Sequence, residues 1–138
     1  MTFVVGEFSA LDIPLRGLTP ETAPLSVLLM DIEADLDIKG VWFESKYPVA
    51  ELAYRLVYWL RDGGQRDFEL DSMSYADKGV VRIVESDDGW RIGSVYAPGK
   101  WTEPYTWDAL VAEIRQFVRT VTEGVTTIGI EPEFLSRA

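Results

Sequence analysis

The sequence predicts an α+β fold, with an antiparallel sheet of about five to six strands and two helices packed on one face. Two clusters of short segments alternate apolar and polar residues, and each cluster precedes a segment with helical spacing of apolar residues. Alternation is typical of antiparallel strands that are wet on one face, whereas parallel strands are continuously apolar. We therefore expect the order β-β-β-α-β-β-β-α in a single domain, residues 1–138.

The first cluster begins with a predicted strand at Thr2–Phe8, followed by a loop rich in proline and glycine. A second strand is expected at about 26–38, and Lys39-Gly40 can turn the chain into a returning strand at 41–44. Residues 28–38 alternate almost without error. If they form one strand, one face is apolar and the other carries carboxylates about 7 Å apart, namely Asp31, Glu33, Asp35 and Asp37.

The first helix is expected to begin at Pro48, where the missing N–H of proline costs nothing. It is expected to end at Gly63-Gly64, because glycine accepts the left-handed conformation of a helix cap. Between these points the apolar residues follow helical spacing, and they are Val49, Leu52, Ala53, Leu56, Val57 and Leu60.

The second cluster alternates again at 67–73, with Asp67, Glu69 and Asp71 on one face and apolar side chains on the other. Asp88-Gly89 lies between two β-rich runs and predicts a hairpin. The second helix is expected from Trp107 to Thr122, with Thr106 as its N-cap. Beyond Gly124 the pattern is ambiguous.

The composition excludes several chemistries. The chain has no cysteine and no histidine, so disulfides, thiol nucleophiles, imidazole bases and thiolate or imidazole metal sites are excluded. With 23 acidic and 13 basic residues the net charge is −10. Such a charge repels nucleic acid and anionic membranes and favours a basic partner. We expect no cofactor. We also expect a cytoplasmic location, because the sequence shows neither a signal peptide nor a membrane span.

The acidic residues allow three interpretations. They can simply keep an exposed sheet face soluble, since carboxylates about 7 Å apart repel only weakly in water. They can form a docking face for a basic protein, made of Asp31, Glu33, Asp35 and Asp37 and, if the two acidic strands are neighbours, Glu69 and Asp71. A divalent metal site, for example between Asp35 and Asp71, is the weakest interpretation, because side chains on one flat strand diverge.

Aromatic residues suggest a different site. Tyr54, Tyr58 and Trp59 lie together on the first predicted helix, and Trp101 lies in a proline-rich loop. Packing of the core explains such residues most simply. The alternative is a pocket for a small apolar ligand, with tyrosine hydroxyls as polar anchors.

Three motifs carry a family resemblance: the helical segment 49–60, the segment 67–75 and the segment 89–96. On these motifs the chain resembles an uncharacterised bacterial family of short acidic α+β proteins, over about residues 25–120. This resemblance implies no activity and no catalytic residues. In size, acidity and outline the chain is also similar to immunity proteins, which neutralise secreted bacterial toxins.

These observations predict a non-enzymatic domain that binds another protein through an acidic sheet face. An immunity-like inhibitor of a basic toxin is its most concrete form. The alternative is a small-ligand-binding protein or minor enzyme that uses the aromatic pocket. The oligomeric state stays open, because a free sheet edge can also pair two copies.

Overall fold

The computed structural model describes residues 2–138 and has an α+β fold with two separate three-stranded antiparallel sheets. The first sheet has the order β1-β2-β3, formed by Phe3–Val5, Ala34–Ile38 and Trp42–Tyr47. The second has the order β4-β5-β6, formed by Phe68–Glu69, Arg82–Ser86 and Gly89–Gly93. The α+β class is confirmed, whereas the expected single sheet of about five to six strands is wrong.

Five helices connect and cover the strands of the described chain. The two long ones are α3 (Val49–Arg61) and α4 (Trp107–Thr127), and they correspond to the two predicted helices. The three short ones were not predicted: α1 (Asp12–Leu15), α2 (Leu25–Asp31) and α5 (Glu133–Ser136). Without the short helices the chain follows the predicted order β-β-β-α-β-β-β-α.

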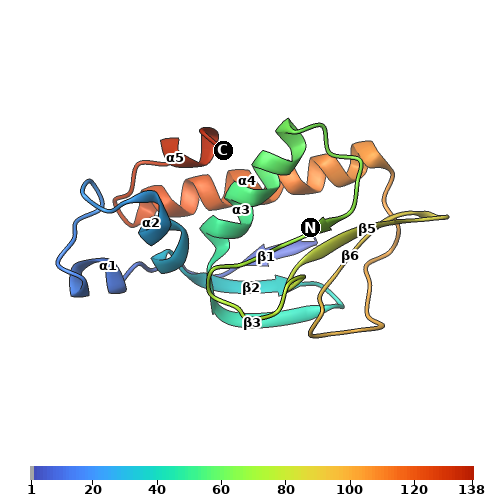
Figure 1. Ribbon diagram of the computed structural model, residues 1–138, viewed down its shortest axis with the longest axis horizontal. Coiled ribbons are helices and arrows are strands. Elements are labelled where there is room, and N and C mark those ends of the chain that lie inside the picture. Colours follow the sequence, from blue (N-terminus) through green and yellow to red (C-terminus); the bar gives the residue numbers. More distant parts are fainter. Residues whose placement is uncertain (1) are drawn as a thin grey trace.

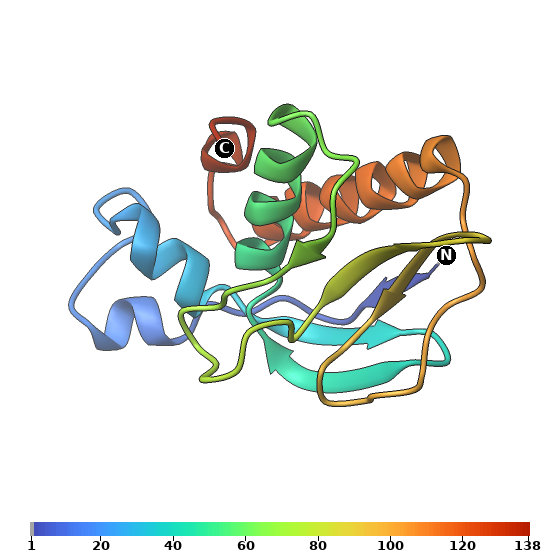
Figure 2. The same cartoon turned by 45° about the vertical axis from the view of Figure 1, so that its right-hand side comes forward.

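Figure 1 shows α3 and α4 on one side of the first sheet, with α1 and α2 at one end of the molecule. In the turned view of Figure 2, β4 lies between α3 and β5. The second sheet also contacts α4 through β6, where the ring centres of Trp90 and Trp107 lie 5.2 Å apart. The N-cap of α4 is Thr106, as predicted, and its hydroxyl accepts the Ala109 N–H at 3.2 Å. Helix α4 continues five residues beyond the predicted end at Thr122.

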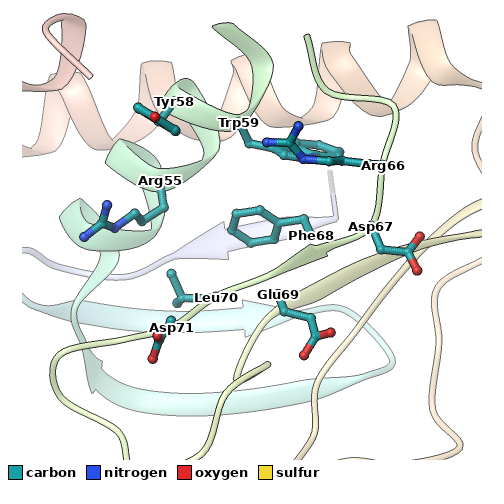
Figure 3. A pocket seen from close by; sticks show the side chains of 9 residues that line it. All are labelled: Arg55, Tyr58, Trp59, Arg66, Asp67, Phe68, Glu69, Leu70 and Asp71. Carbon is teal, nitrogen blue, oxygen red and sulfur yellow. The ribbon is translucent and has the colours of Figure 1, made fainter. Parts of the chain in front are cut away.

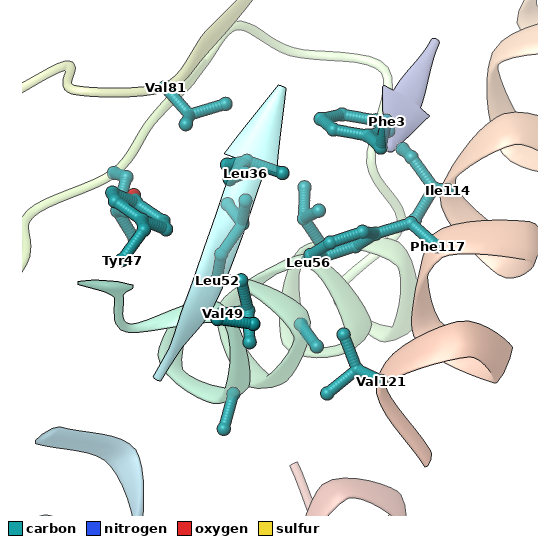
Figure 4. Close-up of a cluster of buried hydrophobic side chains, with 14 of the residues drawn as sticks. Phe3, Leu36, Tyr47, Val49, Leu52, Leu56, Val81, Ile114, Phe117 and Val121 are labelled. Atoms are coloured by element: carbon teal, nitrogen blue, oxygen red, sulfur yellow. The ribbon is translucent and has the colours of Figure 1, made fainter. Parts of the chain in front are cut away.

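The core lies between the first sheet and the two long helices. The alternation predicted for residues 34–38 is confirmed, because Ala34, Leu36 and Ile38 are buried. Figure 4 shows Leu36 facing Leu52 and Leu56 of α3, with Phe117 of α4 beside them. The same buried cluster extends to the second sheet through Phe68, Leu70, Ile83 and Ile92, so one core joins both sheets.

The strand expected over residues 26–38 is wrong in its first half, because residues 25–31 form α2. In that half the apolar run Val27-Leu28-Leu29 is continuous, and all three side chains are buried, which fits a helix rather than a strand. Pro24 immediately precedes this helix. A proline there loses no intrahelical hydrogen bond, and it is the signal that marks the helix start.

Both predicted hairpins are confirmed. Gly40 has a φ of +75°, and Gly89 has a φ of +133°, conformations that favour glycine. At Gly89 a side chain is also excluded by space, since a Cβ would lie 2.6 Å from the Tyr105 carbonyl oxygen. Hairpin turns are local features of the sequence, which is why they were predictable.

Candidate functional site

The two acidic segments lie in different sheets, so they do not form one continuous row. Asp31 ends α2 and is only 3% exposed, which removes it from any docking surface. Its carboxylate binds the Arg16 guanidinium through both oxygens, at 2.6 and 3.1 Å. This hydrogen-bonded ion pair raises the pKa of Arg16 and joins α1 to α2. The expectation that Asp31 points to solvent from a strand is therefore wrong.

The other acidic residues of the first segment differ in exposure. Glu33 is half-buried, and burial, followed by the charge of Asp12, raises the pKa of its carboxyl. Asp35 is exposed, and its Oδ1 accepts the Lys46 N–H at 3.1 Å. This hydrogen bond lies at the point where the pairing of β2 with β3 is irregular. Asp37 is half-buried opposite Val4 and Phe43. Asp35 and Asp37 thus lie on the outward face of the first sheet.

The second acidic segment keeps the predicted alternation completely. Asp67, Glu69 and Asp71 are exposed, while Phe68 and Leu70 between them are buried. Asp67 Oδ1 accepts the Glu85 N–H at 3.2 Å, which ties it to β5. Within residues 2–138, neither Glu69 nor Asp71 forms an ion pair. Glu69 lies opposite Arg82 in the pairing of β4 with β5.

An open groove of about 370 Å³ lies between α3 and the β4 segment, and Figure 3 shows the side chains that line it. The β4 side contributes residues 66–71, and α3 contributes Arg55, Tyr58 and Trp59. Phe68, Leu70 and the 4%-exposed Trp59 give the groove an apolar floor. The groove therefore combines apolar packing with carboxylates at its rim.

The groove brings together parts of both predicted sites. Glu69 and Asp71 come from the acidic set, and Tyr58 and Trp59 come from the aromatic set. The other two aromatic residues do not line it. Trp101 lies under the Arg82 guanidinium, 4.6 Å from its ring centre, and Tyr54 packs on the core beside Arg55. The four aromatic residues do not form a single pocket.

A buried carboxylate that the sequence did not single out holds one end of this groove. Glu51 of α3 is wholly buried, and it accepts hydrogen bonds from the Ser72 hydroxyl and from the Met73 N–H at 2.9 Å. These residues directly follow Asp71, so Glu51 anchors the β4 segment to α3. Arg55 lies four residues after Glu51 in the same helix, and among the described residues the two side chains form no ion pair.

Two kinds of feature are absent from the described part of the chain. Among residues 2–138, no three acidic side chains come together in a group that could hold a metal ion. No helix in that part of the chain combines the length and apolar character of a membrane span.

Comparison with known proteins places the chain in a family. No curated protein matches it, and neither does any solved structure. A family model described as "Domain of unknown function (DUF7878)" matches residues 18–127, which run from the loop before α2 to the end of α4 and include the whole groove. The match covers most of the chain, and the protein belongs to this domain family of unknown function.

Proposed function

We propose that the protein is a non-enzymatic binding protein that recognises a basic partner protein at the groove between α3 and β4. The observation that carries this proposal is the pair Glu69 and Asp71, two exposed carboxylates without an ion pair in the described chain, at the rim of an apolar floor. Rim charges give specificity and speed of association, and the apolar centre of an interface gives most of the affinity.

The charge of the whole chain supports the same partner chemistry. A net charge of −10 attracts a basic protein at long range and repels nucleic acid. Asp35 and Asp37 lie on the other sheet, so they contribute to this field and not to the groove itself. An inhibitor of a basic toxin is one form of this function, and a neighbouring toxin gene would favour it.

The alternative function is binding of a small apolar ligand in the same groove. The indole Nε1 of Trp59 is buried without a hydrogen-bond partner in the described chain, and Trp59 lines the groove. A volume of about 370 Å³ also falls in the range of ligand sites. Binding of an apolar ligand would be insensitive to salt, whereas binding of a basic protein weakens as salt rises.

A capture experiment tests the proposed function. The immobilised protein is incubated with a lysate of the source cells, beside the double variant Glu69→Gln/Asp71→Asn. The matched control is Glu103→Gln/Glu123→Gln, which removes two exposed charges outside the groove. We expect the wild type and the control to retain the same basic proteins, and the groove variant to lose them. Identical sets on all three proteins would contradict the proposal.

A further inference from the structure

We propose that the groove takes an extended segment of the partner, which adds as a strand to the free edge of β4 and alternates basic with apolar side chains. This inference rests on the proposed function and specifies the form of the partner. Extended peptides are recognised at sheet edges by main-chain hydrogen bonds, and their alternate side chains provide specificity.

The edge of β4 that faces α3 is free. β4 is the first strand in the order β4-β5-β6, so within residues 2–138 it pairs with β5 alone. Leu70 uses both main-chain groups on the β5 side: its N–H donates to the Val81 carbonyl at 2.9 Å, and its carbonyl accepts the Gly79 N–H at 2.8 Å. Main-chain groups alternate in direction along a strand, so those of Glu69 point to the opposite edge.

That opposite edge borders the groove. Figure 2 shows α3, and not another strand, beside β4, and Figure 3 shows the α3 side chains across the groove from Glu69. The N–H and carbonyl of Glu69 can therefore pair with one residue of an incoming strand. The α3 wall carries the Arg55 guanidinium and the exposed Tyr58 hydroxyl, which are donors for main-chain carbonyls on the far edge of that strand.

The two faces of β4 fix the side-chain pattern of the incoming strand. Asp67, Glu69 and Asp71 lie on its outer face. Directly opposite side chains interact across strands, and opposite charges are favourable there, so we expect lysine or arginine at alternate positions. On the inner face the neighbours are Phe68 and Leu70, with Trp59 behind them, so the intervening residues should be apolar.

The charges of the two groove arginines do not oppose this pattern. Arg66 forms an ion pair with Asp62, four residues before it, and its charge is partly compensated. Arg55 lies on the α3 wall, with its guanidinium 5.7 Å from the centre of the Tyr54 ring. The basic side chains of the incoming strand would lie over the outer face of the sheet, on the side of the three carboxylates.

A synthetic peptide tests the inference directly. The probe is the acetylated and amidated heptapeptide Thr-Lys-Val-Lys-Val-Lys-Thr, with a glutamate-for-lysine version as the charge control. Two further versions carry N-methyl groups on the odd or on the even main-chain amides, so each blocks one edge of the strand. Binding is measured by isothermal titration calorimetry, and protection of the Glu69 amide is measured by hydrogen exchange.

We expect the lysine peptide to bind and to protect the Glu69 amide, and we expect the glutamate version not to bind. One N-methyl version should lose affinity by roughly tenfold or more, and the other should bind much like the parent, because only one edge pairs with β4. The variant Glu69→Gln/Asp71→Asn should weaken binding, and Glu103→Gln/Glu123→Gln should leave it unchanged.

The outcomes separate this inference from the proposed function. Equal binding of both N-methyl versions, with the carboxylate dependence intact, would overturn strand addition and leave a basic partner in place. Failure of the lysine peptide to bind would also overturn strand addition, and the capture experiment would then decide the proposed function alone. Binding that ignores Glu69→Gln/Asp71→Asn would overturn both.

Discussion

At the residue scale, the acidic side chains divide into structural and exposed groups that the sequence does not separate. Asp31 and Glu51 are buried and hydrogen-bonded, and they hold α1 to α2 and the β4 segment to α3. Asp35 and Glu69 are exposed. A buried carboxylate needs partners brought from elsewhere in the chain. Arg16 is 15 residues from Asp31, and Ser72 is 21 residues from Glu51, so local patterns did not reveal either pair.

Tyr47 gives a prediction at this scale. Its side chain is fully buried, and its hydroxyl has no hydrogen-bond partner in the described chain. An unsatisfied buried hydroxyl is costly, so Tyr47→Phe should increase the free energy of unfolding by on the order of 1 kcal/mol at neutral pH. Urea unfolding measures this, with Tyr58→Phe as the control, because Tyr58 is 54% exposed. A clear loss of stability in Tyr47→Phe would show that its hydroxyl is bonded after all.

The same side chain predicts how stability depends on pH. Burial, followed by the charge of Glu51, raises the pKa of Tyr47 well above 10, and burial with the charge of Glu44 raises the pKa of Tyr75 to about 12. The folded state therefore keeps both hydroxyls protonated after the unfolded state has begun to ionise. Stability is fully present below pH 10 and is lost as the pH rises toward 12. Tyr47→Phe should lose less stability over this range than the wild type.

At the element scale, local signals predicted well and ambiguous apolar runs did not. The glycine turns at Gly40 and Gly89, the cap at Thr106 and the helical spacing of 49–60 all specify structure within a few residues. Residues 25–31 contain a short apolar run that fits either a buried strand or a helix. For the candidate site, the alternation of 67–71 was predictable, whereas its position beside α3 was not.

Gly124 gives a prediction for helix α4. It lies inside this helix, although glycine is a poor helix former, and a Cβ there would overlap the ring of Phe8. Gly124→Ala should therefore lower the free energy of unfolding by about 1 kcal/mol or more, because overpacking outweighs the gain in helix propensity. In a Phe8→Ala background the same substitution should instead be stabilising. A double-mutant cycle measured by thermal unfolding checks this, and the same sign in both backgrounds would contradict it.

At the scale of the whole molecule, the arrangement of the strands in two sheets could not be predicted from the sequence. Each strand cluster forms its own sheet, and a shared core with α3 and α4 joins them. This joining depends on contacts between residues far apart in the chain, such as Phe3 with Phe117, whose ring centres lie 4.9 Å apart. The groove between α3 and β4 depends on the same contacts between distant parts of the chain. A sequence pattern could therefore identify some of its residues, such as Glu69 and Trp59, but not that they lie beside one another.

The net charge of −10 predicts opposite effects of salt on folding and on binding. Self-repulsion destabilises the compact state, and salt screens it. The four ion pairs in residues 2–138 each include at least one arginine or carboxylate open to solvent, so they oppose this trend only weakly.

Raising sodium chloride from about 10 to about 150 mM should therefore raise the melting temperature, because the screening length falls from about 30 to about 8 Å. Over the same range, affinity for the lysine heptapeptide should fall. Glu103→Gln/Glu123→Gln should show a smaller rise in melting temperature than the wild type, because it carries less charge. A melting temperature that falls with salt would mean that attraction between charges, and not repulsion, dominates the folded state.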